Sequence, residues 1–249
     1  MKNMRYVRLD NFRGATLISM MIYHLVWDLV YIYGKNWNWY ESRPAYVWQQ
    51  SICWSFIFLS GFCWSLGSRP LRRGLIVFGG GMLVTIVTMI FMPEQRVVFG
   101  ILTFLGSAML LLTWLDKYWK KVNAKIGLLS SIVLFLWTKE INSGYLGFGR
   151  VARCRLPLEL YRNVVTTYLG FPDSGFYSTD YFSLFPWIFL FFAGYFFYRI
   201  VKEAKKMELF IGKKIPIVGD LGRYSLLIYL LHQPFLYLLL QILNLMDII

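Results

Sequence analysis

The sequence contains few charged residues, two histidines and three cysteines. Only 16% of its 249 residues are Asp, Glu, Lys or Arg, whereas 57% are hydrophobic. Soluble globular proteins carry about 25% charged residues, so this composition excludes a soluble enzyme. A disordered chain is excluded as well, because 19% of the residues are aromatic and could not stay solvated. The apolar residues form continuous runs rather than short alternating segments, which excludes an outer-membrane barrel.

The cysteines and histidines show no metal-ligand spacing. Cys53, Cys63 and Cys154 are an odd number, and the first two fall inside an apolar run. We therefore expect neither a disulfide framework nor a metal site.

Seven apolar runs approach the length of a membrane-spanning helix, which needs about 20 residues. They cover residues 15–33, 45–67, 74–92, 97–115, 126–138, 182–200 and 225–245. The fifth is the shortest, and a run of this length can also be a buried or re-entrant segment. The sequence therefore predicts an all-α fold, a polytopic integral membrane bundle of about seven transmembrane helices that forms a single domain over residues 1–249.

Two local patterns have a structural interpretation. Gly79, Gly80 and Gly81 lie within the third run, where small residues are more typical of close helix packing than of a phosphate-binding loop. The long polar stretch 140–181 contains a segment, residues 156–169, that is suited to a short amphipathic helix on the membrane surface.

The basic residues predict the orientation, because cytoplasmic loops of membrane proteins carry an excess of Lys and Arg. With seven crossings and the N-terminus inside, the inner segments hold 18 of the 26 basic residues and the outer segments hold 8. If the fifth run does not cross, the counts become 16 and 10. We expect a multi-pass protein of the cell membrane with its N-terminus in the cytoplasm and its C-terminus outside. The net charge of +13 then reflects orientation rather than a nucleic-acid partner.

Both histidines lie inside predicted spans, where ionisable groups are costly and are functional candidates by default. At about 1.5 Å per residue, His24 and His232 lie roughly 14 Å and 10 Å from the cytoplasmic ends of their runs, so they could share a site. Asp28 follows His24 by four residues and is placed to orient the imidazole as a base. Arg13 precedes His24 by eleven residues and falls on the same helix face.

These residues also have structural interpretations. His24 and Asp28 could simply satisfy each other and hold two helices together. His232 is followed by Gln233 and Pro234, and polar side chains at a proline kink can satisfy freed backbone groups. Arg13, taken alone, could also be one of the basic residues that set the orientation of the protein in the membrane.

Five blocks of the sequence resemble, in order, the bacterial branch of the heparan-α-glucosaminide N-acetyltransferase catalytic-domain family. They are RLDNFRGATLISMMIYHLVWDL at 8–29, SFIFLSGFCWSLG at 55–67, FGILTFLGSAMLL at 99–111, STDYFSLFPWIFLFFAGY at 178–195 and LGRYSLLIYLLHQPFL at 221–236. The spacing of Arg13 and His24 is also similar to a signature of wider integral-membrane acyltransferases. In this alignment the catalytic histidine of the lysosomal enzyme falls near Lys35, and Thr103 stands where histidine or glutamine is expected.

The resemblance implies transfer of an acetyl group from cytosolic acetyl-CoA to a small-molecule or glycan acceptor across the membrane, with no metal. From their placement inside the predicted spans, we expect His24, Asp28 and His232 to be the catalytic residues, and Asp180 is a candidate acceptor contact. The CoA phosphates would be held by a set of arginines, namely Arg8, Arg13, Arg69, Arg72 and Arg73. Membrane lipids are the surrounding partners, and a homo-oligomer is one option for assembly.

A different class of function fits the same residues. Intramembrane His and Asp side chains also serve as proton relays, so the alternative is a transporter or a non-catalytic envelope scaffold. An inverted repeat would favour transport, and none is visible in the sequence.

Overall fold

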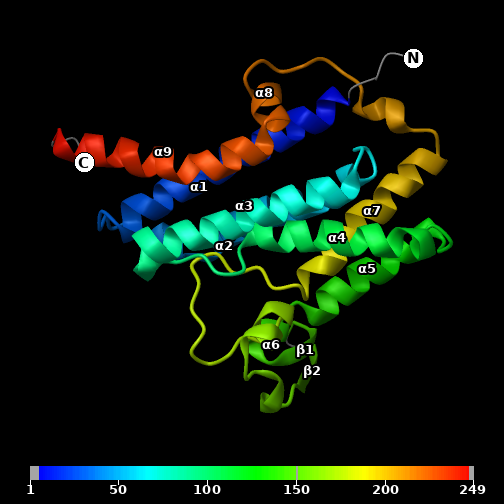
Figure 1. Ribbon diagram of the computed structural model, residues 1–249, viewed down its shortest axis with the longest axis horizontal. Helices are drawn as coiled ribbons and strands as arrows, with labels where there is room; N and C mark the ends of the chain where they lie inside the picture. The colour runs from blue at the N-terminus through cyan, green and yellow to red at the C-terminus, as the bar shows by residue number, and fades with distance from the viewer. Residues whose placement is uncertain (1–5, 150, 247–249) are drawn as a thin grey trace. The chain divides into compact units, whose positions relative to one another are not determined.

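The computed structural model describes residues 6–149 and 151–246 and is dominated by helices (Figure 1). Within these residues the α-helices are α1 (Val7–Tyr31), α2 (Arg43–Trp64), α3 (Pro70–Phe91), α4 (Ile101–Trp119), α5 (Ala124–Thr138), α6 (Val164–Leu169), α7 (Trp187–Glu203), α8 (Val218–Arg223) and α9 (Ser225–Leu245). The expected all-α fold is confirmed. One short antiparallel hairpin, β1 (Tyr145–Phe148) and β2 (Val151–Arg155), was not expected.

Each of the seven apolar runs falls largely within one helix, and four of these helices are long and apolar enough to cross a membrane. The four are α1, α3, α4 and α9. α5 and α7 have 15 and 17 residues, and at about 1.5 Å per residue they are shorter than the roughly 30 Å hydrocarbon core. Four apolar helices fit a membrane protein, and the count of seven crossings stays a prediction. The chain ends, residues 1–5 and 247–249, lie outside the described part of the chain.

The chain divides into two compact units. The first combines Met1–Phe56 with Lys205–Ile249, and the second is Ile57–Ala204. The first unit is therefore built from both ends of the sequence, and the boundary between the units falls inside α2. The expectation of a single domain over the whole chain stays a prediction.

In the first unit, α8 meets α1 through backbone contact at two glycines. A Cβ atom on Gly14 would lie 1.8 Å from the carbonyl oxygen of Val218, and one on Gly222 would lie 1.8 Å from that of Asp10. Only glycine permits this approach, and it fixes the point from which the next helix departs. α9 then runs alongside α1 (Figure 1), which brings residues at the two ends of the sequence together.

Aromatic side chains fix the second half of α1 within the same unit. The Trp48 indole donates a hydrogen bond to the Ser19 hydroxyl at 2.8 Å, and the Tyr40 hydroxyl donates to the Tyr23 carbonyl at 3.2 Å. The rings of Tyr40 and Trp48 each lie 5.1 Å from the ring of Tyr23. Because Tyr23 directly precedes His24, these contacts fix the rotation of α1 and hence the direction in which the His24 side chain points.

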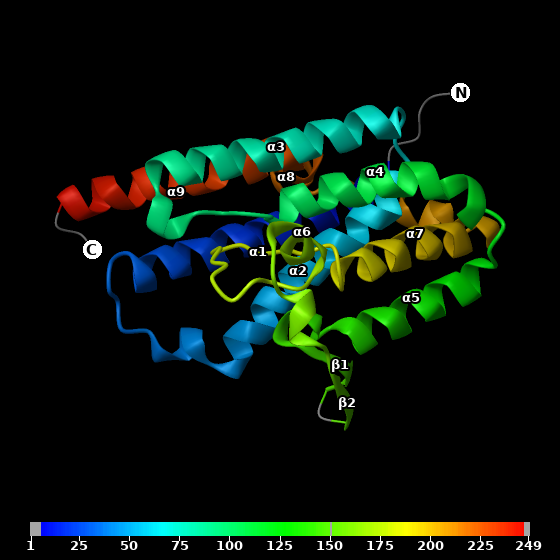
Figure 2. The same ribbon diagram turned by 60° about the horizontal axis from the view of Figure 1, so that its bottom comes forward.

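In the second unit, α3 packs along α4 and α5 packs against α7 (Figure 2). A Cβ atom on Gly81 would lie 2.4 Å from the backbone nitrogen of Thr103, whereas one on Gly79 would meet nothing within 4 Å. The packing interpretation of the glycine cluster is therefore confirmed for Gly81, where α3 and α4 touch.

The polar stretch that follows α5 is less helical than expected. Within residues 156–169 only a 3₁₀ turn (Leu158–Leu160) and α6 are helical, so the predicted surface helix is limited to its last six residues. α6 starts with a capping box between Asn163 and Thr166, a pattern that stabilises a helix start locally. Further on, residues around Ser178 and Asp180 are bonded to the start of α4.

Candidate functional site

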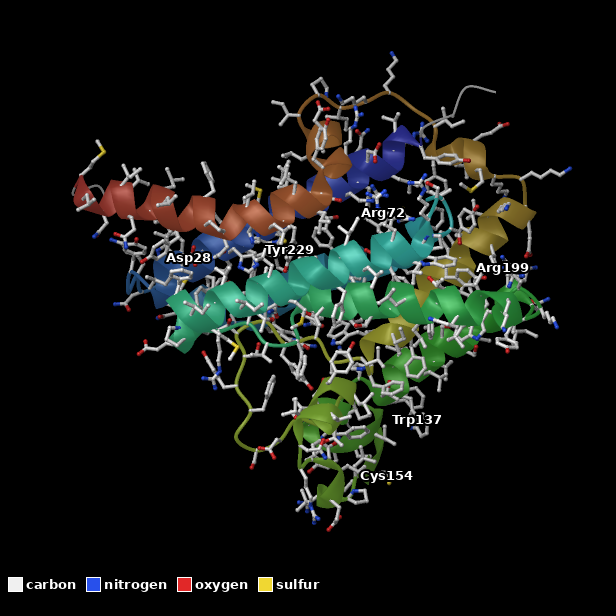
Figure 3. All side chains as sticks on the ribbon, viewed as in Figure 1. Asp28, Arg72, Trp137, Cys154, Arg199 and Tyr229 are labelled. Carbon is white, nitrogen blue, oxygen red and sulfur yellow. The ribbon has the colours of Figure 1, made fainter. Side chains whose placement is uncertain are left out.

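The centre of the first unit contains four polar side chains on two adjacent helices. His24 and Asp28 belong to α1, and His232 and Gln233 belong to α9. Asp28 is fully buried and His232 is 6% exposed. Figure 3 marks Asp28 on α1 and Tyr229 on α9, the two helices that carry this set, which we call the buried polar cluster.

Asp28 is bonded to Gln233 rather than to His24. The Gln233 side-chain nitrogen donates to Asp28 Oδ1 at 2.8 Å. The spacing of the sequence predicts that Asp28 orients His24 on the same helix; in the structure the Asp28 carboxylate is instead hydrogen-bonded to Gln233 on α9. The bond links the two helices that carry the histidines.

The orienting partner of His232 is a backbone carbonyl. Its Nδ1 lies 2.5 Å from the carbonyl oxygen of Tyr229, one helical turn earlier. A carbonyl oxygen only accepts hydrogen bonds, so Nδ1 carries the hydrogen and Nε2 of the neutral ring presents a lone pair. Nε2 is buried and has no hydrogen-bond partner among the described residues. His232 thus combines a structural contact on one nitrogen with an available acceptor on the other.

The rings of His24 and His232 form a tilted pair. Their centroids lie 4.9 Å apart with an angle of 59° between the planes. The two histidines, which the sequence suggests could share a site, thus lie side by side, and their depth in a membrane stays a prediction. Both imidazoles are close enough to act on one bound group.

Several buried polar atoms around this pair have no hydrogen-bond partner within the described part of the chain. They are Asp28 Oδ2, Gln233 Oε1, His232 Nε2 and the hydroxyl of Tyr33. An unsatisfied buried polar atom costs about 1–3 kcal/mol, and native proteins contain few of them. Three of these atoms lie on α1 and α9, and the fourth belongs to Tyr33, two residues after the end of α1, so they mark a polar region that is suited to binding a polar group. Sequence analysis missed Gln233 as Asp28's partner and Tyr33 as part of this region.

The arginines at the start of α1 are engaged in local contacts. Arg13 forms an ion pair with Asp10 at 3.2 Å, and Arg8 donates a hydrogen bond to the Leu209 carbonyl at 2.9 Å. Two pockets open beside them in the first unit. One is lined by Arg8 and Lys213 among apolar side chains, and the other by Asp10, Lys214 and Arg223.

The basic residues Lys213, Lys214 and Arg223 extend the cationic surface that Arg8 and Arg13 begin. In the sequence these three residues contribute only to the count of basic residues that predicts the membrane orientation. Their run between two apolar segments was the available clue, but proximity to Arg8 and Arg13 depends on how α8 and the preceding segment return to α1.

The other three predicted phosphate contacts belong to the second unit. Arg69 precedes α3 with a left-handed backbone (φ 54°), and Arg72 is exposed on the first turn of α3 (Figure 3). Arg73 donates a hydrogen bond to the Trp64 carbonyl at 3.1 Å, at the end of α2. Arg73 therefore has a structural role between two helices, while Arg69 and Arg72 project into solvent.

Asp180 supports the start of α4. Its Oδ2 accepts a hydrogen bond from the backbone nitrogen of Ile101 at 3.1 Å, so it satisfies one of the free N–H groups at that helix end. Burial raises the pKa of the Asp180 carboxyl to about 6, and the bond from Ile101 opposes this rise. The role of Asp180 as an acceptor contact stays a prediction, because the structure shows only its capping contact.

Comparison with curated proteins and with solved structures finds no match. A family model described as "Heparan-alpha-glucosaminide N-acetyltransferase, catalytic" matches residues 5–234. The match includes both histidines, Asp28, Gln233 and all five arginines discussed above. Because it covers most of the sequence, the chain belongs to this family of membrane acetyltransferases.

Proposed function

We propose that this protein transfers an acetyl group from cytosolic acetyl-CoA to an amine or hydroxyl group of an acceptor, an amino sugar or glycan, across the membrane. The observation that carries the proposal is the His24–His232 pair, in which His232 presents an unpartnered Nε2 beside the second imidazole. A lone pair held in a fixed direction at a buried site is what a general base requires.

The chemistry needs one proton acceptor and one attacking group. The acceptor's amine or hydroxyl gives its proton to an imidazole nitrogen as its nitrogen or oxygen attacks the thioester carbonyl. The carbon–sulfur bond then breaks, and the CoA sulfur leaves as a thiolate that takes up a proton. Alternatively, a histidine nitrogen attacks first and carries the acetyl group before passing it on. The two rings, 4.9 Å apart, are close enough for one to accept the proton while the other contacts the acetyl group.

Asp28 and Gln233 are positioning residues in this proposal. Within the described residues Asp28 is hydrogen-bonded to Gln233 and not to the histidine that it was expected to orient, and this bond fixes the residue next to His232. Rotation of α9 about its axis would move the Nε2 atom of His232 away from His24. The Asp28–Gln233 bond opposes such a rotation.

The basic residues at the chain's predicted cytoplasmic side are proposed to hold the CoA phosphates. In the first unit Arg8 and Arg13 are joined by Lys213 and Lys214, which line the two adjacent pockets. In the second unit the exposed Arg69 and Arg72 form a separate, alternative set of candidates. Charge-assisted hydrogen bonds to phosphate are among the stronger polar contacts in proteins, and Arg is well suited to them.

A proton relay remains the rival function, since the same four polar side chains could pass protons between the two helices. The two functions differ in their products. Acyl transfer yields an acetylated acceptor and free CoA, whereas a relay moves protons without consuming acetyl-CoA.

The test is acetyl transfer from labelled acetyl-CoA in proteoliposomes, with acetyl-CoA outside and glucosamine as the acceptor inside. His24→Asn and His232→Asn keep a polar side chain but remove the base, so each should lower the rate by about 10²–10⁴. Gln241→Asn, two turns further along α9, is the matched control and should transfer normally. Rates within a few-fold of wild type for both histidine variants would refute the proposal, and proton uptake without acetyl transfer would favour the relay.

A further inference from the structure

The second unit contains a pocket that the predicted active site does not use. It has a volume of about 520 Å³ and lies where the C-terminal ends of α2, α4 and α7 meet. Small-molecule sites typically have volumes of about 300–1,000 Å³. We call it the Tyr195 pocket, after the tyrosine that lies beneath it. Its lining combines aromatic side chains with basic and acidic ones.

The inner wall of the pocket is aromatic and rigid. Trp64 and Tyr195 are almost fully buried, and their rings meet edge to face at 5.9 Å. The Trp64 indole donates to the Met109 carbonyl at 3.2 Å, and the Tyr195 hydroxyl donates to Asp116 Oδ1 at 2.8 Å. Each ring is thus fixed both by packing and by its polar atom, so this wall is preformed.

The acidic groups in the pocket are already paired. Asp116 Oδ2 lies 2.5 Å from the ammonium of Lys120, and Glu203 pairs with Arg199 at 3.2 Å. Arg199 also donates to the carbonyls of Trp119 and Val122 at 2.7 and 2.9 Å, so three of its five N–H groups are engaged in these contacts (Figure 3 marks Arg199 on α7).

Of the three basic residues in the lining, Lys202 is the one that does not take part in these ion pairs. It is exposed, it has no carboxylate partner within the described residues, and its ammonium lies 5.9 Å from the ring centre of Tyr198. With Lys120, Arg199 and Lys202 against Asp116 and Glu203, the lining carries one net positive charge. An incoming anion therefore meets an unpaired ammonium above an aromatic wall.

We propose that the Tyr195 pocket binds the phosphate group of an amphiphilic phosphate ester, with Lys202 as the primary contact. Basic pockets between transmembrane helices at a cytoplasmic face are suited to phospholipid head groups, and the predicted orientation places these three helix ends there. A nucleotide phosphate offers the same chemistry, with a ring that could pack on the aromatic wall. The proposal does not depend on acetyl transfer by the histidine pair.

The test measures binding to the purified full chain in nanodiscs. One arm titrates CoA by calorimetry in phosphatidylcholine nanodiscs. The other counts phosphatidylglycerol molecules that remain bound in native mass spectra after both lipids are supplied. Lys202→Gln should weaken at least one of these two interactions by about tenfold, the loss expected for a charge-assisted hydrogen bond, whereas Lys202→Arg should retain it. Lys121→Gln is the matched control, because Lys121 is exposed beside Lys120 but does not line the pocket.

Each outcome decides the proposal. A loss of phosphatidylglycerol binding alone identifies a lipid head group, a loss of CoA binding alone identifies a nucleotide, and a loss of both shows that the pocket takes either phosphate. Unchanged binding of both probes in Lys202→Gln, or equal losses in Lys121→Gln, overturns it. Neither arm requires acceptor or turnover, so failure here is distinct from failure of the acetyltransferase proposal.

Discussion

Gln233 donates a hydrogen bond of 2.8 Å to Asp28, and this bond joins α9 to α1 beside the two histidines. Asp28 is fully buried, and its other oxygen has no hydrogen-bond partner within the described part of the chain. The bond to Gln233 is thus the main compensation that the structure shows for burying this carboxyl group. It links Asp28 in α1 to Gln233 in α9, the residue that follows His232.

The first prediction concerns this bond. Gln233→Leu leaves the Asp28 carboxyl buried without its donor and should lower the free energy of unfolding by about 1–3 kcal/mol. The double variant Asp28→Leu with Gln233→Leu removes both partners and should cost less than the sum of the single changes. Thermal unfolding in detergent would measure the four members of this cycle. Additive effects would show that the two side chains are not energetically coupled.

A second prediction compares two neighbouring glycines in α3. Gly81→Ala places a Cβ atom 2.4 Å from the backbone of Thr103, which cannot move without shifting α4, and should lower the melting temperature. Gly79→Ala meets open space and should stabilise the helix by about 0.5–1 kcal/mol, because alanine loses less backbone entropy than glycine. Thermal unfolding of both variants measures these effects, and the two shifts in melting temperature should have opposite signs. Destabilisation of equal size at both positions would contradict the close contact.

The third prediction concerns the pH dependence of stability. Burial raises the pKa of Asp180 to about 6, against about 3.9 in an unfolded chain. The folded state therefore holds this proton more tightly, so its contribution to stability is largest at low pH and is lost as the pH rises from about 4 to 6. Asp180→Asn cannot ionise and keeps an oxygen for the Ile101 nitrogen. Its melting temperature relative to wild type should increase across this window.

Two further observations make the Asp180 measurement decisive. Asp180→Ala also removes the charge but loses the cap on α4, so it should be less stable than Asp180→Asn by about 1 kcal/mol. Melting profiles of wild type and Asp180→Asn that run parallel from pH 4 to pH 7 would show that the carboxyl group does not titrate in this range.

A fourth prediction addresses the arginines before and within α3. Arg73 is bonded to the Trp64 carbonyl, so changing it would disturb packing as well as charge. The double variant Arg69→Gln with Arg72→Gln avoids this and should weaken CoA binding while reducing its salt dependence. Lys121→Gln with Lys125→Gln removes two exposed charges from another predicted inner segment as the control. Normal CoA binding combined with inverted insertion would identify Arg69 and Arg72 as orientation signals only.

The last prediction concerns topology. Seven crossings with the N-terminus inside place Ile249 outside, so a reporter fused after it that works only in the cytoplasm should be inactive. α5, with 15 residues, is the helix on which this result depends. An active reporter would remove the fifth crossing and place the C-terminus inside.

The helical fold and the identity of the polar positions could be predicted from the sequence, because they depend on local pattern. A run of apolar residues forms a helix wherever its backbone groups must bond internally, and α9 spans the same residues as its run. α4 and α7 begin later than their runs. Val98 and Phe99 are hydrogen-bonded to Ser178 and Phe182 instead, and Pro186 disfavours a helical conformation at the residue before it.

The sequence by itself determined that His24, Asp28 and His232 lie within apolar helices, since their surroundings along the chain are enough to show it. Only the tertiary structure decided their partners. Whether Asp28 bonds to His24 or Gln233 depends on how α1 and α9 are rotated and offset. The backbone contact of Gly14 and Gly222 between α1 and α8 and the aromatic packing around Tyr23 set these quantities. Asp28 and Gln233 are more than 200 positions apart in the sequence, so no local sequence pattern can predict their contact.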